Sequence, residues 1–335
     1  MTNGSVRYGI ISTANIALKS HIPAARESSN SDILAICSRS EAKAKLVAEE
    51  HHIPTWYGTY NDLLDDPNID AVINALPNSM HCEWTVKAAE AGKHILCEKP
   101  LAVTTDEARK MIDAANQNGV VLVEAFTHRW NNHLRSARKL IAEGAIGRLT
   151  NLQSIVAWNI TEREGDIRFS PELAGGIMMD GGCYGVYACR FVLGKEPIKA
   201  SGFAYDSGSY GVDTTFDGLI EFPDGEVAYI HSSMDEPTNV SLTAIGTEGI
   251  IEIPEIFNDS GPLVIKTGDE EIIEAVPTPS RYLAQINEFS ECILTGMAPE
   301  FPAEDGLANT AALVALLSSA RNKTVEDIEQ TGYQF

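Results

Sequence analysis

The first 125 residues alternate between short apolar runs and segments with helical spacing. The apolar runs are rich in β-branched residues, whereas the segments between them carry helix-forming and capping residues. The predicted strands lie at residues 7–11, 33–37, 71–75, 95–97 and 120–123, and the predicted helices lie at 40–50, 79–91 and 105–118. Strands and helices that alternate in this way form a parallel sheet with helices on both faces.

The pattern changes after about residue 125. Two predicted helices at 131–143 and 183–193 precede strands at 199–206, 213–222, 226–234, 239–245 and 249–253, and helices at 280–294 and 304–320 close the chain. Asp224-Gly225 and Thr247-Glu248-Gly249 provide turn residues between successive strands, as in β-hairpins. We therefore predict an α/β protein of two domains, 1–125 with a parallel sheet and 126–335 with a large, open, mostly antiparallel sheet.

The composition excludes several classes of partner. Lysine and arginine number 25 against 47 aspartates and glutamates, so the 335-residue chain has a net charge of −22. Nucleic acids and anionic membranes attract basic proteins, and we expect neither as a partner. No apolar run approaches the ~20 residues of a membrane span, and the amino-terminal residues lack signal-peptide features, so we expect a cytoplasmic protein. The six cysteines lie mostly in apolar runs without metal-ligand spacing, which predicts reduced core residues and no metal site.

The first strand is followed by a turn that fits a dinucleotide. The turn reads Ser12-Thr13-Ala14-Asn15-Ile16-Ala17 and occupies the place of a G-x-G-x-x-G/A motif, with small residues in place of the glycines. After the second strand, where an acidic residue would select NAD, the chain has Ser38 and Arg39. A hydroxyl and a guanidinium bind a 2′-phosphate, so we expect NADP in preference to NAD.

Candidate chemical groups lie at the ends of later predicted strands. Lys99, in Glu98-Lys99-Pro100, and the pair Pro77-Asn78 each follow a strand whose carboxyl end faces the crevice where ligands bind. Asp180 and Tyr184 lie four residues apart at the start of a helix, among paired glycines. Together, Asp, Tyr and Lys are able to move a proton from a substrate hydroxyl. Taken alone, Asp180 is equally typical of a helix cap and Tyr184 of a packed core residue.

These motifs together resemble one known family. The resemblance covers nearly the whole chain and rests on the βα turn with Ile16-Ala17, Pro77-Asn78-Ser79-Met80-His81, Glu98-Lys99-Pro100, Glu124-Ala125-Phe126, Gly176 to Tyr184, and Gly246-Thr247-Glu248-Gly249. The order and spacing are similar to those of the glucose–fructose oxidoreductase/inositol dehydrogenase (Gfo/Idh/MocA) family. The resemblance implies an N-terminal Rossmann domain and a C-terminal α+β domain that binds substrate and supports homodimers or homotetramers.

The resemblance also implies site residues and an activity. It assigns catalysis to Lys99, Tyr184 and Asp180, with the tyrosine resembling the branch that holds dimeric dihydrodiol dehydrogenase and NADP-linked aldose 1-dehydrogenases. We expect Tyr184 to take the hydroxyl proton, Lys99 to lower the pKa of that tyrosine, and Asp180 to position the sugar or the lysine. The expected cofactor-binding residues are Ser12, Thr13, Ala14, Asn15, Ile16, Ser38, Arg39, Pro77, Asn78, His81, Glu98, Lys99 and Arg129.

Alternatives remain at the level of the sequence. Arg129 fits either the nicotinamide pocket or a packed hinge between domains. The expected activity is NADP-dependent oxidation of a sugar or polyol, chiefly at C1 of an aldose such as D-xylose or D-glucose. The same residues are compatible with a dihydrodiol or dicarbonyl oxidoreductase, and the fold is compatible with a sugar sensor that binds NADP without turnover. Retention of Lys99 and Tyr184 argues against the sensor, which has no need of a proton relay.

Overall fold

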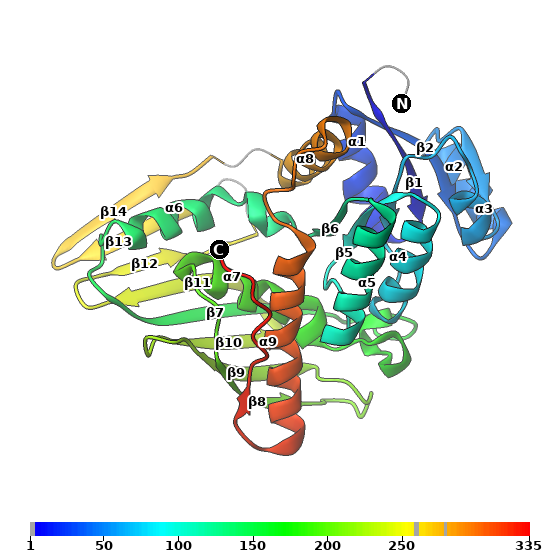
Figure 1. Ribbon diagram of the computed structural model, residues 1–335. Helices are drawn as coiled ribbons and strands as arrows, with labels where there is room; N and C mark the ends of the chain where they lie inside the picture. Colours follow the sequence, from blue (N-terminus) through cyan, green and yellow to red (C-terminus); the bar gives the residue numbers. More distant parts are fainter. Residues whose placement is uncertain (1–3, 258–260, 278–279) are drawn as a thin grey trace. The chain divides into compact units, whose positions relative to one another are not determined.

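The computed structural model describes residues 4–257, 261–277 and 280–335. The chain forms two compact units, which Figure 1 shows coloured along the sequence. The first unit consists of Met1–Ala102, Asp106–Thr127 and Ser280–Gly306, and the second of Val103–Thr105, His128–Pro279 and Leu307–Phe335. Each unit is built around its own sheet.

The first unit holds a six-stranded sheet in the order β3-β2-β1-β4-β5-β6. Every neighbouring pair is parallel, as the alternating pattern predicts. The strands are β1 (Val6–Ile11), β2 (Ser31–Cys37), β3 (Thr55–Tyr57), β4 (Ala71–Asn74), β5 (His94–Glu98) and β6 (Leu122–Ala125). The order reverses direction between β1 and β4, which is the switch point where a Rossmann sheet binds its ligand.

Helices join these strands. They are η1 (Ala17–His21) with α1 (Ile22–Glu27), α2 (Glu41–Glu50), α3 (Tyr60–Leu64), η2 (Asn78–Met80) with α4 (His81–Glu90), and α5 (Thr105–Asn118). The prediction missed β3 and α3. Both are short, and the three residues of β3 are only half-buried, so neither leaves a long apolar period in the sequence.

A helix from near the carboxyl end of the chain completes the first unit. The buried residues Ile286, Phe289 and Ile293 of α8 (Arg281–Thr295) recur at helical spacing and belong to the same apolar cluster as β1. The hydroxyl groups of Tyr8 on β1 and Ser290 on α8 share a hydrogen bond of 2.7 Å. The predicted division at residue 125 is therefore corrected: Ser280–Gly306 belongs with the first sheet, because its apolar face is buried there.

The second unit holds a nine-stranded sheet in the order β14-β13-β12-β11-β7-β10-β9-β8-β15. Its neighbours are antiparallel except β7 and β10, which are parallel. The strands are β7 (Leu149–Asn159), β8 (Lys199–Tyr205), β9 (Thr215–Glu221), β10 (Val227–Ser233), β11 (Asp235–Gly246), β12 (Ile250–Ile253), β13 (Pro262–Thr267), β14 (Glu270–Ala275) and β15 (Glu326–Asp327). The predicted mostly antiparallel sheet is confirmed, but β7 enters between β10 and β11 and interrupts the expected meander.

Helices pack on one face of this sheet. α7 (Cys183–Leu193) contacts β7 and β10, and α6 (Asn132–Ala142) packs against α7. α9 (Ala303–Asn322) approaches β8 and β9 at the cross-strand pair Gly202 and Gly218, where added Cβ atoms would lie 2.8 Å from the Leu316 carbonyl oxygen and 2.7 Å from a Leu316 methyl. The missing side chains therefore let the helix lie directly on the strands.

The opposite face of the sheet exposes apolar side chains. Phe203 on β8 and Leu219 on β9 are 74% and 48% exposed and point away from the buried face, as the alternating burial of both strands requires. Among the described residues, no helix is long and apolar enough to cross a membrane.

Candidate active site

The turn after β1 has the form expected of a dinucleotide-binding turn. Ser12 has φ of 126°, a conformation that favours glycine, and its Oγ accepts a hydrogen bond from the Ala14 amide at 3.0 Å. Ala14 replaces the second glycine of the motif with the smallest side chain that has a Cβ. The turn residues Ser12 to Ile16 are partly or fully exposed, and Ala17 is buried where the following helix packs. The residues therefore fit a pyrophosphate approaching the start of this helix.

The end of β2 presents a second group for the nucleotide. Arg39 is exposed, and Ser40 follows it as the N-cap of α2, accepting from the Lys43 amide at 3.4 Å. Burial raises the pKa of the Tyr60 phenol, and the charge and hydrogen bond of Arg39 partly offset this rise. A guanidinium beside a helix N-terminus offers two favourable interactions to an anion, in agreement with the predicted 2′-phosphate site.

A buried ion pair holds the end of β5. Glu98 is 7% exposed, and the Nε2 group of His21, from the end of η1, donates to its Oε1 at 2.6 Å. Burial tends to raise the pKa of Glu98, but the hydrogen bond and charge of His21 outweigh it, so the pKa is lowered. The other carboxylate oxygen accepts from the Lys99 amide at 3.2 Å. Glu98 therefore fixes the backbone of Lys99, whose side chain is half-buried.

The structure corrects the role expected of His81. The side chain is fully buried, and its Nδ1 and Nε2 lie 2.9 Å from the carbonyl oxygens of Pro100 and Leu76. With both ring nitrogens engaged inside the protein, His81 does not face a cofactor. It instead connects the segment after β4 to the turn after β5, where the Lys99–Pro100 peptide is cis. Pro77 and Asn78, on the same segment, are half-buried.

A tyrosine from α8 also belongs to this cluster. The ring of Tyr282 meets the ring of His21 edge-on, with centroids 5.6 Å apart. Burial and the Glu98 charge raise the pKa of Tyr282, whereas a hydrogen bond from Ser20 and the Lys99 charge lower it in part. Sequence reasoning missed both His21 and Tyr282. His21 lies one helical turn beyond a recognised motif, and Tyr282 reaches the site only through long-range packing.

In the second unit, Asp180 lies in a π-helical turn. The turn, η6 (Met178–Gly182), runs directly into α7. The Nε group of Arg168 donates to Asp180 Oδ2 at 2.6 Å. The charge of Asp180 raises the pKa of the Arg168 guanidinium, although burial opposes the rise. An added Cβ on Gly181 would lie 2.9 Å from both Ile177 and Trp158, so this glycine lets the π turn pack closely.

Tyr184 is half-buried among aromatic rings. Its ring centroid lies 4.5 Å from His128 and 5.0 Å from Phe257, with the Phe257 ring nearly perpendicular. The structure therefore places Asp180 and Tyr184 on one helical segment, as predicted, with Arg168 beside the acid and two rings beside the phenol. Arg168, His128 and Phe257 were missed, because an arginine in a loop and aromatic residues near an element end are ordinary features of any sequence.

Arg129 packs against residues of the second unit. The side chain is fully buried, and its guanidinium lies 5.8 Å from the centroid of the Tyr187 ring. Its carbonyl oxygen accepts from Arg135 Nε at 2.9 Å. A guanidinium near a core ring stabilises the packing of the second unit. The predicted contact of Arg129 with the cofactor stays a prediction. Within the described part of the chain, no cluster of three or more metal-ligating side chains occurs.

Two family models match the chain. A model described as an oxidoreductase family with an NAD-binding Rossmann fold matches residues 6–126. A second, described as the GFO/IDH/MocA C-terminal domain, matches residues 134–252. Together the two matches span more than half of the chain, and the family resemblance inferred from the motifs is confirmed.

Individual proteins are similar over most or nearly all of the chain. D-xylose 1-dehydrogenase (NADP(+)) 2 from Haloferax volcanii is 34% identical over 326 residues, covering 96% of this chain and 99% of the relative. Trans-1,2-dihydrobenzene-1,2-diol dehydrogenase from Xenopus laevis is 31% identical and covers 79% and 80% of the two chains. The crystal structure of aldose-aldose oxidoreductase from Caulobacter crescentus, complexed with glycerol, has a TM-score of 0.88 at 29% identity and covers 96% and 99%.

The ion pair at the end of β5 leads to a prediction about stability. Replacing Glu98 with Gln removes one partner of a buried pair, which typically costs about 3–5 kcal/mol of unfolding free energy. Because the pKa of Glu98 is lowered in the folded state, its contribution is present above the unfolded value and is lost as the pH falls through the folded value. We therefore expect Glu98→Gln to be strongly destabilised at pH 7, and the difference from wild type to shrink below about pH 4.5. Urea unfolding at several pH values measures this.

An exposed pair supplies the control. Glu83 and Lys87 form an i,i+4 ion pair on α4 at 2.6 Å, with side chains 57% and 41% exposed. Glu83→Gln removes the same charge and should cost less than about 0.5 kcal/mol. Equal effects of the two substitutions would show that the buried pair does not stabilise β5.

Proposed function

We propose that this chain, which belongs to the Gfo/Idh/MocA family of oxidoreductases, is an NADP-dependent sugar dehydrogenase. Its reaction is the oxidation of an aldose such as D-xylose or D-glucose at C1, which yields a lactone. The observation that carries the proposal is the full-length similarity to a D-xylose 1-dehydrogenase that uses NADP. The six cysteines are all free and buried, which supports a cytoplasmic location, and fractionation of the source cells tests it.

The first unit carries the groups proposed to hold NADP. Residues Ser12 to Ile16 would receive the pyrophosphate, and Ser38 and Arg39 the 2′-phosphate. Pro77, Asn78 and Lys99 follow strand ends of the same sheet. When bound, the nicotinamide exchanges a hydride with the substrate carbon.

The proposed acid–base group is Tyr184. A phenol has an ordinary pKa near 10 and is a weak base at neutral pH, so it needs a nearby positive charge to favour the phenolate. We assign that charge to Lys99, which also orients the substrate hydroxyl. Asp180, held by Arg168, positions the sugar or the lysine. The assignment combines residues of both units on chemical grounds and on the family membership.

One observation favours a second candidate. Tyr184 is flanked by the rings of His128 and Phe257, a surface that suits a flat carbocycle as well as a sugar face. The similarity to a dihydrodiol dehydrogenase agrees with this. The alternative is therefore oxidation of a dihydrodiol, or reduction of a dicarbonyl, by the same residues.

The cofactor proposal predicts the effect of one substitution. Arg39→Ala removes a charge-assisted contact with the 2′-phosphate, which is worth roughly 1.5–3 kcal/mol. NADP affinity should fall about ten- to a hundredfold, whereas NAD affinity should hardly change. Fluorescence titration with both reduced cofactors measures this. Equal losses for the two would show that Arg39 does not recognise the phosphate.

The proposed reaction predicts which substrates and residues support turnover. With NADP, the wild-type enzyme should oxidise D-xylose or D-glucose faster than polyols or dihydrodiols, as followed by nicotinamide absorbance. General acid–base groups contribute about 10²–10⁴-fold, so Tyr184→Phe and Lys99→Ala should each lower kcat by about that factor while NADP still binds. The double variant should be little worse than either single one, because the two groups act as a unit.

Each outcome has a distinct meaning. Turnover of dihydrodiols alone would establish the second candidate. NADP binding without turnover of any sugar, polyol, dihydrodiol or dicarbonyl would favour the sensor. Near-normal kcat in Tyr184→Phe would remove the tyrosine from the mechanism and leave Lys99 as the acid–base group.

The exposed sheet face supports a homodimer or homotetramer. Phe203 and Leu219 would remain in water in a monomer, and large apolar side chains gathered on one surface commonly mark an interface. We expect light scattering at micromolar concentration to give two or four times the chain mass of 36.3 kDa. A mass of one chain would contradict the proposal.

A further inference from the structure

The helical segment that carries Asp180 and Tyr184 begins without a side-chain cap of its own. Its first backbone N–H groups lack partners within the helix, and Ile177, at the N-cap of η6, contributes no side-chain hydrogen bond. A residue more than 30 positions later fills this role. The Ile177 amide donates to the backbone oxygen of Asp213 at 2.8 Å, and the Met178 amide donates to Asp213 Oδ2 at 2.7 Å.

The residue before the helix is shaped to receive Asp213. Gly176 has φ of 105°, which side chains other than glycine rarely adopt. A Cβ added to Gly176 would lie 2.1 Å from Asp213 Oδ1, so the carboxylate lies directly over this glycine. The amide of Gly176 donates to the carbonyl oxygen of Arg168 at 2.8 Å, which connects the same turn to the partner of Asp180. The backbone amides at the start of the helix are therefore bonded to two other segments, those that contain Arg168 and Asp213.

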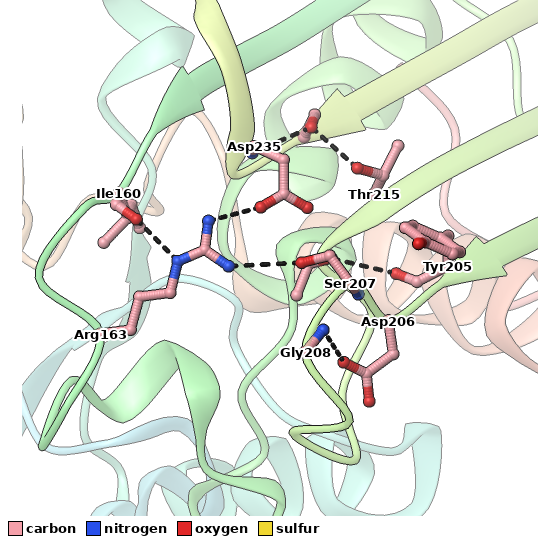
Figure 2. Close-up of polar contacts among 10 residues, drawn as sticks. Ile160, Arg163, Tyr205, Asp206, Ser207, Gly208, Thr215 and Asp235 are labelled. Carbon is pink, nitrogen blue, oxygen red and sulfur yellow. Dashed lines mark hydrogen bonds and ion pairs between the residues drawn. The ribbon is translucent and has the colours of Figure 1, made fainter.

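The loop that carries Asp213 is itself firmly held. Figure 2 shows Arg163 bridging three segments: its guanidinium donates to the Ile160 carbonyl oxygen at 2.8 Å, to Ser207 Oγ at 3.3 Å and to Asp235 at 2.5 Å. Asp206 accepts from the backbone amides of the turn that follows it, including Gly208. These hydrogen bonds restrict the loop and therefore the position of Asp213.

We propose that Asp213 is a positioning residue that anchors the first turn of the η6–α7 helix and thereby aims Asp180 and Tyr184. The inference rests on the proposed function, because aim matters only if these two groups act on a substrate. The hydrogen bonds that Asp213 accepts at the start of the helix come from the backbone amides of Ile177 and Met178.

The anchor depends on pH. Burial raises the pKa of Asp213 to about 7, although the amide of Met178 and the backbone of Asp213 itself act in the opposite direction. The other charged or titratable groups lining its cavity of about 440 Å³ are Asp206, Tyr205 and Arg321. Asp206 adds to the rise in pKa. Because the pKa of Asp213 is raised in the folded state, this site holds the neutral carboxyl best, and a local opening that exposes Asp213 to water releases a proton. The anchor therefore loosens as the pH rises through about 7.

Amide hydrogen exchange tests the anchor directly. In wild type, after correction for intrinsic exchange rates, peptides covering residues 176–182 should lose protection between pH 6 and 8, as Asp213 ionises. Asp213→Asn keeps the shape and an acceptor oxygen but does not ionise, so its protection should not change with pH over this range. Asp213→Ala removes the acceptor and should lower protection severalfold at every pH. Asp224→Asn, at an exposed turn in the same unit, is the charge-matched control and should behave as wild type.

Steady-state kinetics provides a second measurement. Misplacing reacting groups by a fraction of an ångström commonly costs about ten- to a hundredfold, so Asp213→Ala should lower kcat by that amount with an unchanged KM for NADP. Asp213→Asn should restore most of the rate and lose the wild-type change in kcat near pH 7. Wild-type protection of residues 176–182 in Asp213→Ala would overturn the proposal, as would a wild-type loss of protection between pH 6 and 8 in Asp213→Asn. If wild type oxidises no sugar, the proposed function fails, and the exchange measurement still decides whether Asp213 anchors the helix.

Discussion

The buried carboxylate of Glu98 is the constraint on which the first unit's site depends. An unpaired carboxylate at this depth would cost several kcal/mol, so Glu98 is tolerated only with the imidazole of His21 and the Lys99 amide as its donors. These contacts join the helix that follows the nucleotide turn to the strand end that presents Lys99. A change that moves one of them therefore moves the other, although the two lie far apart in sequence.

In the second unit, other side chains hold the residues of the proposed site in place. The groups proposed to react lie on one helical segment, and side chains from elsewhere in the unit hold that segment: Arg168 binds Asp180, and Asp213 binds the helix start. The π-helical turn that contains Asp180 forms fewer standard helix bonds than an α-helix, and such turns are frequent at functional sites. External contacts are what keep it in one conformation. In both units, therefore, the residues of the proposed site are positioned by polar and charged side chains, and the apolar core provides the surrounding fold.

The sequence predicts the strands and helices better than it predicts the side chains that hold the site residues in place. The strands β1, β2, β4 and β5 lie where their apolar runs are, because they are buried on both faces and read as continuous hydrophobic stretches. Of the strands that were missed, β3 is half-buried and β14 is exposed along its whole length, so neither leaves a buried apolar run. β7 and β13 were missed although each contains buried apolar residues. The same limit applies to the site. Asp180, Tyr184 and Lys99 stand in motifs, whereas His21, Arg168 and Asp213 acquire a role only through partners distant in sequence, which no local pattern records. His81 was misplaced for the converse reason, since a polar residue beside a motif gives no sign of whether it turns inward.

The nucleotide-binding turn after β1 lacks the glycines of the usual G-x-G-x-x-G/A motif. Contacts made by neighbouring side chains explain how the turn keeps its shape without them. Ser12 adopts a φ of 126° that costs a residue with a Cβ about 1–3 kcal/mol, a strain that glycine would avoid. Its hydroxyl accepts the Ala14 amide, an interaction that glycine has no means of making, and this offsets part of the cost. The same hydrogen bond engages an amide of the turn, and the packing of Ala17 and His21 behind it fixes the start of the helix. The turn is thus held in shape by a side chain and by the Glu98 ion pair, where the usual motif relies on glycine to adopt that shape without strain. A motif defined by glycines is therefore one solution to a geometric requirement, and the requirement itself, a tight turn with small residues before a fixed helix start, is retained in this chain.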